Sequence, residues 1–153
     1  RRGTLRNKVA ECFERAGLPN TSEEEMKKLL SFVIIGGGPT GVEVAAEVHD
    51  LVNDNLARLY PDLIPHCTIR LVGSDDHILS TYDRAISNFA EKQFARSGIE
   101  SILHNRATAV TKDTVKLLDK KTGEEWEIPH SVCLWATGIK MNPLIKTIQD
   151  ALP

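Results

Sequence analysis

A glycine-rich turn lies between a short apolar segment and a helix-forming segment. Residues 31–35 read Ser-Phe-Val-Ile-Ile, and residues 36–43 continue as Gly-Gly-Gly-Pro-Thr-Gly-Val-Glu. Gly36, Gly38 and Gly41 occupy the three glycine positions of the G-x-G-x-x-G pattern, which is typical of dinucleotide-binding turns. The pattern alone is weak, but a strand before it and a helix after it are the context that the fingerprint requires. The stretch therefore predicts a dinucleotide site on a Rossmann-like sheet.

Each glycine of the turn has its own physical reason. Gly36 allows a tight turn off the strand, Gly38 lets the backbone approach a pyrophosphate, and Gly41 lets the helix pack close to the strand. The unpaired N–H groups of the first helical turn would face the phosphates. We therefore expect the pyrophosphate to be held by Gly36, Gly37, Gly38, Pro39, Thr40 and Gly41.

Composition restricts the class of protein. The chain has 153 residues, enough for one domain with a sizeable core, and 41% of them are hydrophobic. A net charge of -2 argues against nucleic acid as a partner, because phosphate neutralisation needs a basic face. The three cysteines, Cys12, Cys67 and Cys133, form no C-x-x-C pair, so neither a disulfide framework nor a metal site is expected. The chain begins at Arg1 rather than Met, and we expect it to be a piece of a longer protein.

Alternating strands and helices follow the first turn. Strands are predicted at residues 31–35, 68–72 and 100–103, with a long helix from residue 39 to the proline at 61 and another over 81–97. This β-α-β-α-β order requires a parallel sheet with right-handed crossovers. Two helices are expected in a lead-in over residues 1–30, the second beginning with a capping box at Ser22.

Short strand-like runs then break the alternation. Residues 107–111, 114–118 and 125–128 are joined by links that suit only antiparallel neighbours, so they predict a β-meander. Residues 131–135 return as a buried strand of the parallel sheet. The expected fold class is α/β, a Rossmann-like parallel sheet with an antiparallel β-meander in one crossover. The Rossmann-like domain spans 31–140, and a terminal helix follows over 141–153.

Three strand ends are expected to converge on one site, because ligands of open parallel sheets bind outside the carboxyl ends of the strands. Besides the glycine turn, these ends supply Gly73, Ser74, Asp75, Ala136, Thr137 and Gly138. An acidic residue usually follows the second strand and binds the adenosine ribose, but Gly73 stands there. Asp75 or Asp76 could reach the ribose instead, or both could simply be turn residues.

Glu43 has two interpretations as well. It lies in the first turn of the helix, where the helix dipole favours a carboxylate. The alternative is that it faces the nicotinamide end of a bound dinucleotide. The residue pattern leaves the choice open.

Several stretches together resemble the NADH-binding segment of type II NADH:quinone oxidoreductases, the alternative single-chain NADH dehydrogenases. They are residues 36–43, 45–50 (Ala-Ala-Glu-Val-His-Asp), 59–61 (Leu-Tyr-Pro), 76–79 (Asp-His-Ile-Leu) and 135–138 (Trp-Ala-Thr-Gly). The resemblance covers nearly the whole chain. The glycine-rich stretch alone is shared with wider flavoprotein reductases, whereas its combination with His49-Asp50 and Trp135–Gly138 is more specific.

The resemblance implies a role within a larger flavoprotein. Proteins of that family have one Rossmann-like domain for FAD and one for NADH, and they pass hydride from NADH to FAD and electrons to a quinone. It implies that this chain is the NADH-binding domain, inactive alone, and that residues 141–153 lead back to the FAD domain. Glu43 then matches the glutamate near the nicotinamide–flavin contact, as a tentative catalytic residue, and Ala136–Gly138 match backbone lining the nicotinamide pocket.

Location and partners follow from the same resemblance. It implies a peripheral protein of the mitochondrial inner membrane, with quinone and membrane contacts made by segments outside this chain, and it is compatible with a homodimer. Gly73 departs from the family's usual glutamate, which would repel a 2′-phosphate, so NADPH stays open beside NADH. Two other functions also stay open: the nucleotide-binding module of another flavoprotein reductase, and a non-catalytic NAD-sensing domain.

Overall fold

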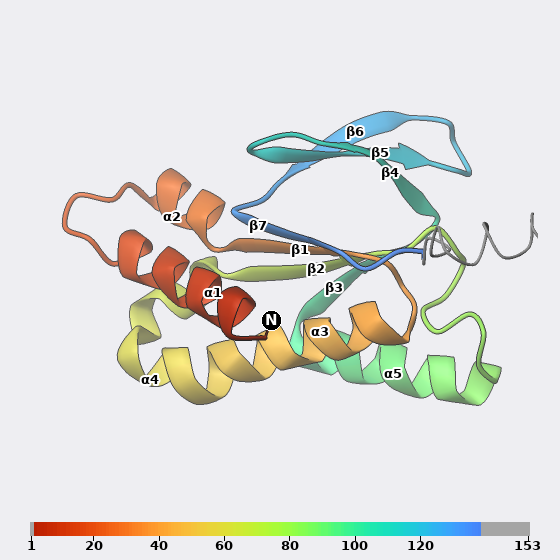
Figure 1. The fold of residues 1–153 in the computed structure, drawn as a ribbon, viewed down its shortest axis with the longest axis horizontal. Helices are drawn as coiled ribbons and strands as arrows, with labels where there is room; N and C mark the ends of the chain where they lie inside the picture. The colour runs from red at the N-terminus through yellow and green to blue at the C-terminus, as the bar shows by residue number, and fades with distance from the viewer. Residues whose placement is uncertain (1, 139–153) are drawn as a thin grey trace, which may run out of the picture.

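A four-stranded parallel sheet forms the centre of the computed structural model, which describes residues 2–138 (Figure 1). Its strand order is β3-β2-β1-β7, and every neighbouring pair is parallel. The strands are β1 (Ser31–Ile35), β2 (Thr68–Val72), β3 (Ile99–Ile102) and β7 (Val132–Trp135). The predicted α/β fold class with a parallel sheet is confirmed.

Strand β1 is buried on both faces, as its continuous apolar sequence predicts. Phe32 and Ile34 pack with the helices, whereas Val33 and Ile35 belong to a second core on the opposite face. This alternation follows from the two-residue period of a strand. The glycine turn thus follows the most completely buried strand of the described sheet.

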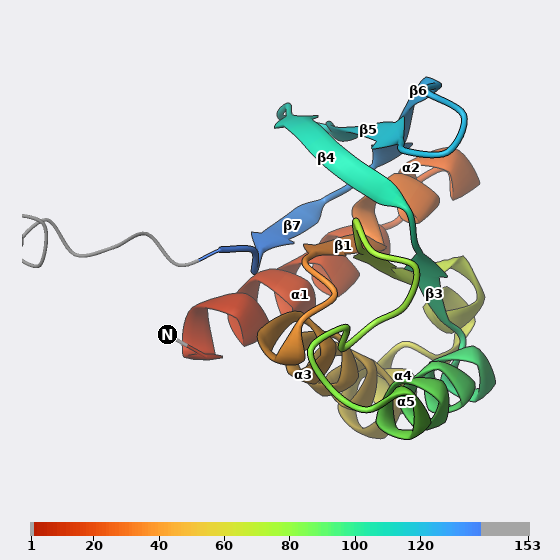
Figure 2. The same ribbon diagram turned by 90° about the vertical axis from the view of Figure 1, so that its right-hand side faces the viewer.

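Most of the helices cover one face of the sheet (Figures 1 and 2). Within residues 2–138, four are regular α-helices of at least seven residues: α1 (Arg2–Ala16), α2 (Glu23–Leu29), α3 (Pro39–Asp50) and α5 (Arg84–Ser97). Phe13 of α1 stacks on Phe32 of β1 with ring centroids 6.3 Å apart, so the lead-in shares the core of the sheet. Ser22 caps α2 by accepting a hydrogen bond from the Glu25 N–H at 3.2 Å, which confirms the predicted helix start.

Two helix boundaries differ from the prediction. The helix beginning at Pro39 becomes a π-helix, η1 (Leu51–Leu56), before the short α4 (Ala57–Leu59) and the 3₁₀-helix η2 (Pro61–His66). Val52 and Leu56 stay buried along this stretch, so apolar spacing alone could not reveal the wider turn. Helix α5 starts at Arg84 rather than residue 81, because Asp83 is its extended N-cap residue and the Tyr82 N–H closes a turn onto the Leu79 carbonyl.

An antiparallel sheet covers the other face, confirming the predicted β-meander between β3 and β7 (Figure 1). Its strands are β4 (Asn105–Val110), β5 (Thr114–Asp119) and β6 (Glu125–Pro129). Val115, Leu117 and Ile128 are buried in one core with Val33 and Ile35 of β1. Alternation with polar residues predicts Trp126 on the same buried face as Ile128. That prediction is wrong, because Trp126 is 41% exposed and donates a hydrogen bond to the Asn105 side chain at 2.8 Å.

Strand β7 is less buried than its apolar sequence suggests. It lies at the edge of the described sheet, with β1 as its neighbour, and Trp135 is 55% exposed. The prediction of a buried strand is therefore wrong, because an edge strand has a neighbouring strand on one side only. The predicted terminal helix over 141–153 lies outside the described residues.

Within residues 2–138, no helix has the length and apolar content needed to cross a bilayer. The same described part contains no group of three or more His, Cys, Asp or Glu side chains arranged to hold a metal ion.

We expect the Cys67 thiol to be unreactive in the folded chain. Burial raises its pKa from 9.0 to about 12, and thiolate is the reactive species. Iodoacetamide labelling at about pH 8, followed by mass spectrometry, should be at least about tenfold slower at Cys67 than in the urea-unfolded chain. Equal labelling rates would contradict this burial.

Because the pKa is raised by folding, the thiol's contribution to stability is present below pH 9.0 and lost as the pH rises further.

Candidate functional site

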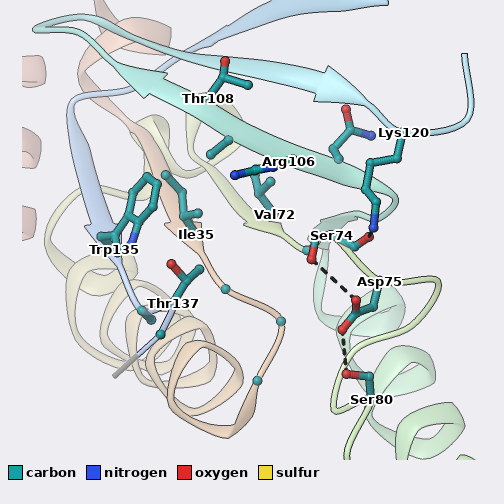
Figure 3. A pocket seen from close by; sticks show the side chains of 18 of the residues that line it. Ile35, Val72, Ser74, Asp75, Ser80, Arg106, Thr108, Lys120, Trp135 and Thr137 are labelled. Atoms are coloured by element: carbon teal, nitrogen blue, oxygen red, sulfur yellow. Dashed lines mark hydrogen bonds between the residues drawn. The ribbon is translucent and has the colours of Figure 1, made fainter. Parts of the chain in front are cut away.

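A cleft of about 760 Å³ opens at the carboxyl ends of the parallel strands (Figure 3). Three groups of lining residues come from the ends of β1, β2 and β7, and a fourth comes from the meander. The predicted convergence of three strand ends is therefore confirmed. The residues just after those strands that line the cleft are Gly36, Gly37, Gly38, Gly73, Ser74, Asp75, Ala136, Thr137 and Gly138.

Gly36 joins two of these strand ends. Its φ of +129° suits glycine, and a Cβ there would lie 2.7 Å from the Ala136 carbonyl oxygen. The Ala136 N–H donates to the Ile35 carbonyl at 2.7 Å, which continues the pairing of β1 with β7 up to the turn. The close approach of residue 136 to the glycine turn thus depends on a residue without a side chain.

Gly38 and Gly41 differ in what surrounds them. A Cβ at Gly41 would lie 1.8 Å from the Gly36 carbonyl oxygen, so the close packing of α3 on the turn requires glycine. A Cβ at Gly38 would meet no described atom within 4 Å. Gly38 is the N-cap of α3 and lines the cleft, so its missing side chain leaves open space in front of the helix N-terminus.

Pro39, Thr40 and Gly41 start α3 just beyond the cleft and do not line it. Pro39 occupies the first helical position, where its missing N–H has no intrahelical partner to lose. The N–H groups of this first turn remain available for an anion by the geometry of a helix. Contacts of these three residues with a nucleotide remain predictions.

The loop after β2 is organised around Asp75. The Ser80 hydroxyl donates to one carboxylate oxygen at 2.6 Å, and the Ser74 hydroxyl donates to the other at 3.5 Å. Asp76 pairs instead with His77 and Arg84, and the hydrogen bond from His77 lowers the pKa of the Asp76 carboxyl. Both aspartates therefore shape the loop, and of the two only Asp75 lines the cleft.

The sequence did not predict the contribution of the meander. Asn105, Arg106, Ala107 and Thr108 of β4 line the cleft, as does Lys120 from the turn between β5 and β6. The Asn105 N–H donates to the Gly73 carbonyl at 3.0 Å, which joins β4 to the end of β2. Lys120 donates from its ammonium to the Ser74 carbonyl at 3.0 Å. No local pattern marks these residues, because the packing of the two sheets brings them to the cleft.

Glu43 lies outside the cleft. Its exposed side chain lines a neighbouring hollow between α1 and α3, together with Thr40 and Leu134 of β7. Its place on the first turns of α3 agrees with the sequence, and its predicted approach to a nicotinamide remains a prediction.

The chain is similar to a known protein family and to two plant proteins. The pattern of the pyridine nucleotide-disulphide oxidoreductase family matches residues 7–152. The chain is 42% identical over 146 residues to the mitochondrial external alternative NAD(P)H-ubiquinone oxidoreductase B1 of Solanum tuberosum, covering 95% of the chain and 25% of that protein. It is 43% identical over 148 residues to the B4 protein of Arabidopsis thaliana, again covering 25% of the relative and 97% of the chain.

A solved structure agrees with the fold. NDH2 from Plasmodium falciparum, in complex with NADH, superposes with a TM-score of 0.92 and 29% identity, covering 98% of this chain and 31% of that one. In sequence, the chain spans about a quarter of the length of the two plant relatives. From the family match and the glycine-lined cleft, we conclude that the chain belongs to the pyridine nucleotide-disulphide oxidoreductase family.

Proposed function

We propose that this chain is the NAD(P)H-binding domain of a flavin-dependent dehydrogenase that reduces a quinone. The plant relatives are named NAD(P)H-ubiquinone oxidoreductases, and the similar NDH2 structure contains NADH. The observation that carries the proposal is the cleft at the three strand ends, where Gly38 leaves the space that a pyrophosphate needs.

The residues of the cleft suit an extended dinucleotide. The glycine turn and the N-terminus of α3 would hold the pyrophosphate through backbone N–H groups and the helix dipole. The adenosine half would lie toward Gly73–Asp75, and the nicotinamide half toward Ala136–Gly138. FAD, bound mainly by other parts of the whole protein, supplies the hydride acceptor when present. The chain alone is therefore expected to bind nucleotide without oxidising it.

Location and further partners are part of the same proposal. The plant relatives are named mitochondrial, so we place the whole protein at the mitochondrial inner membrane as a peripheral protein. Its quinone site and membrane contact would lie outside the described residues, and a homodimer is compatible with this arrangement.

Glu43→Gln in the full-length flavoprotein is expected to slow flavin reduction by NADH about tenfold. The nicotinamide becomes cationic as it loses hydride, and a nearby carboxylate would stabilise that charge. Glu47, one turn further along α3, gives a matched control: Glu47→Gln should leave the rate unchanged. Anaerobic stopped-flow absorbance of the flavin measures both rates.

The same measurement tests the function itself. Bleaching of the flavin by NADH supports the proposal, whereas nucleotide binding without bleaching would favour a non-catalytic NAD-sensing domain. Equal rates for wild type and Glu43→Gln would remove Glu43 from the reaction and leave the nucleotide site in place.

A further inference from the structure

The end of β2 is where a Rossmann-like site distinguishes its two dinucleotides. A carboxylate at that point binds the ribose 2′-hydroxyl of NAD and repels the 2′-phosphate of NADP. Gly73 is the first residue after β2 in this chain, and it carries no side chain. The site therefore lacks the usual carboxylate at this position.

A cation lies beside the same position. The ammonium of Lys120 donates a hydrogen bond to the carbonyl oxygen of Ser74, the residue after Gly73, at 3.0 Å. This contact places the positive charge at the strand end and holds the turn between β5 and β6 against it. Figure 3 shows the Lys120 side chain extending from the meander to Ser74, on the edge of the cleft.

A second cation lines the same cleft. Arg106 is an exposed residue of β4, and its side chain extends over the cleft in Figure 3. Within residues 2–138, no carboxylate forms a salt bridge with Arg106 or Lys120, so neither charge is neutralised by an ion pair there. Both side chains come from the meander rather than from the strand–helix unit that carries the glycine fingerprint.

One carboxylate opposes these two cations in the cleft. Of the Asp, Glu, Lys and Arg side chains that line it within residues 2–138, Asp75 is acidic and Arg106 and Lys120 are basic. Asp75 accepts hydrogen bonds from the hydroxyls of Ser74 and Ser80, and His77 pairs with Asp76. The balance of formal charge in the lining is therefore positive, which suits an additional phosphate group.

We infer that the site accepts the 2′-phosphate of NADPH, and that Lys120 and Arg106 of the meander bind it. This inference rests on the proposed nucleotide-binding function and specifies the substrate for it. Lys120 then acts as a specificity residue, favouring the phosphorylated dinucleotide by a charge-assisted hydrogen bond. Arg106 adds a second positive charge with several donors.

Calorimetry of the full-length protein with NADP⁺ and NAD⁺ tests the inference, because the oxidised forms bind without hydride transfer. We expect the wild-type protein to bind NADP⁺ no more than tenfold more weakly than NAD⁺. Lys120→Met, which keeps the length of the side chain, should weaken NADP⁺ binding about tenfold and change NAD⁺ binding less than twofold. Lys121→Met removes the same charge from the neighbouring residue, which does not line the cleft, and should change neither.

Gly73→Glu supplies the reciprocal variant. A Cβ at Gly73 would have no described atom closer than 3.4 Å, so the first side-chain atom fits without a clash. The new carboxylate should lower NADP⁺ affinity at least tenfold while retaining NAD⁺ binding.

Two results would overturn the inference while leaving the proposed function intact. One is a wild-type preference for NAD⁺ above tenfold, and the other is a Lys120→Met protein that binds NADP⁺ as tightly as wild type or loses both dinucleotides equally. A wild-type protein that binds neither dinucleotide would contradict the proposed function as well.

Discussion

Gly38→Val is expected to abolish saturable NADH binding while leaving the chain folded. The valine side chain would occupy the open space in front of α3, where a bound pyrophosphate would lie. No described atom lies within 4 Å of a Cβ at this position, and the φ of −80° is accessible to any residue. The main cost to stability is therefore a poorer N-cap, about 1 kcal/mol. Titration calorimetry measures the binding, and urea unfolding measures the stability.

Ser22→Val is the matched control for Gly38→Val. It replaces the N-cap of α2 with the same residue, far from the cleft lining, and removes a hydrogen bond to the Glu25 N–H. It should lower the free energy of unfolding by about 1 kcal/mol and leave NADH affinity unchanged. Unchanged NADH binding in Gly38→Val would mean that the nucleotide does not pass over this turn.

Gly41→Ala is expected to destabilise the chain by about 3 kcal/mol or more, through one added methyl group. Its Cβ would lie 1.8 Å from the Gly36 carbonyl oxygen, a backbone atom that cannot move without shifting the turn or α3. Circular dichroism during urea unfolding measures the loss. Gly38→Ala adds the same methyl group three residues earlier and should cost about 1 kcal/mol. An unfolding midpoint for Gly41→Ala equal to that of Gly38→Ala would contradict the tight packing of α3 on the turn.

Much of the fold was predictable from local patterns. The bounds of β1 and β2 match their predicted ranges, because continuous apolar runs bounded by turn residues mark buried strands. The meander was predictable from link lengths that suit only antiparallel pairs. The π-helix η1 was not predictable, because its buried residues keep a spacing that an α-helix would also show. The edge position of β7 depends on which strands pair, and apolar content does not encode that choice.

The candidate site, too, has one part that the sequence predicts and one part that it does not. The glycine turn was predictable because it needs particular backbone geometry, and Gly36 and Gly41 each stand where a Cβ would collide with backbone. The positions of Arg106 and Lys120 were not predictable, because these residues reach the cleft only when the meander packs across the parallel sheet. Their positions depend on contacts between residues far apart in sequence, such as the bond from Lys120 to Ser74.

Calorimetric titration of the 153-residue chain with NADH tests the central claim most directly, because the claim is that this turn and cleft bind a dinucleotide. The account predicts a saturable heat with one site per chain for the wild type, and its loss in Gly38→Val. A wild-type chain that gives no saturable heat, or a Gly38→Val chain that gives the same heat as wild type, would contradict it.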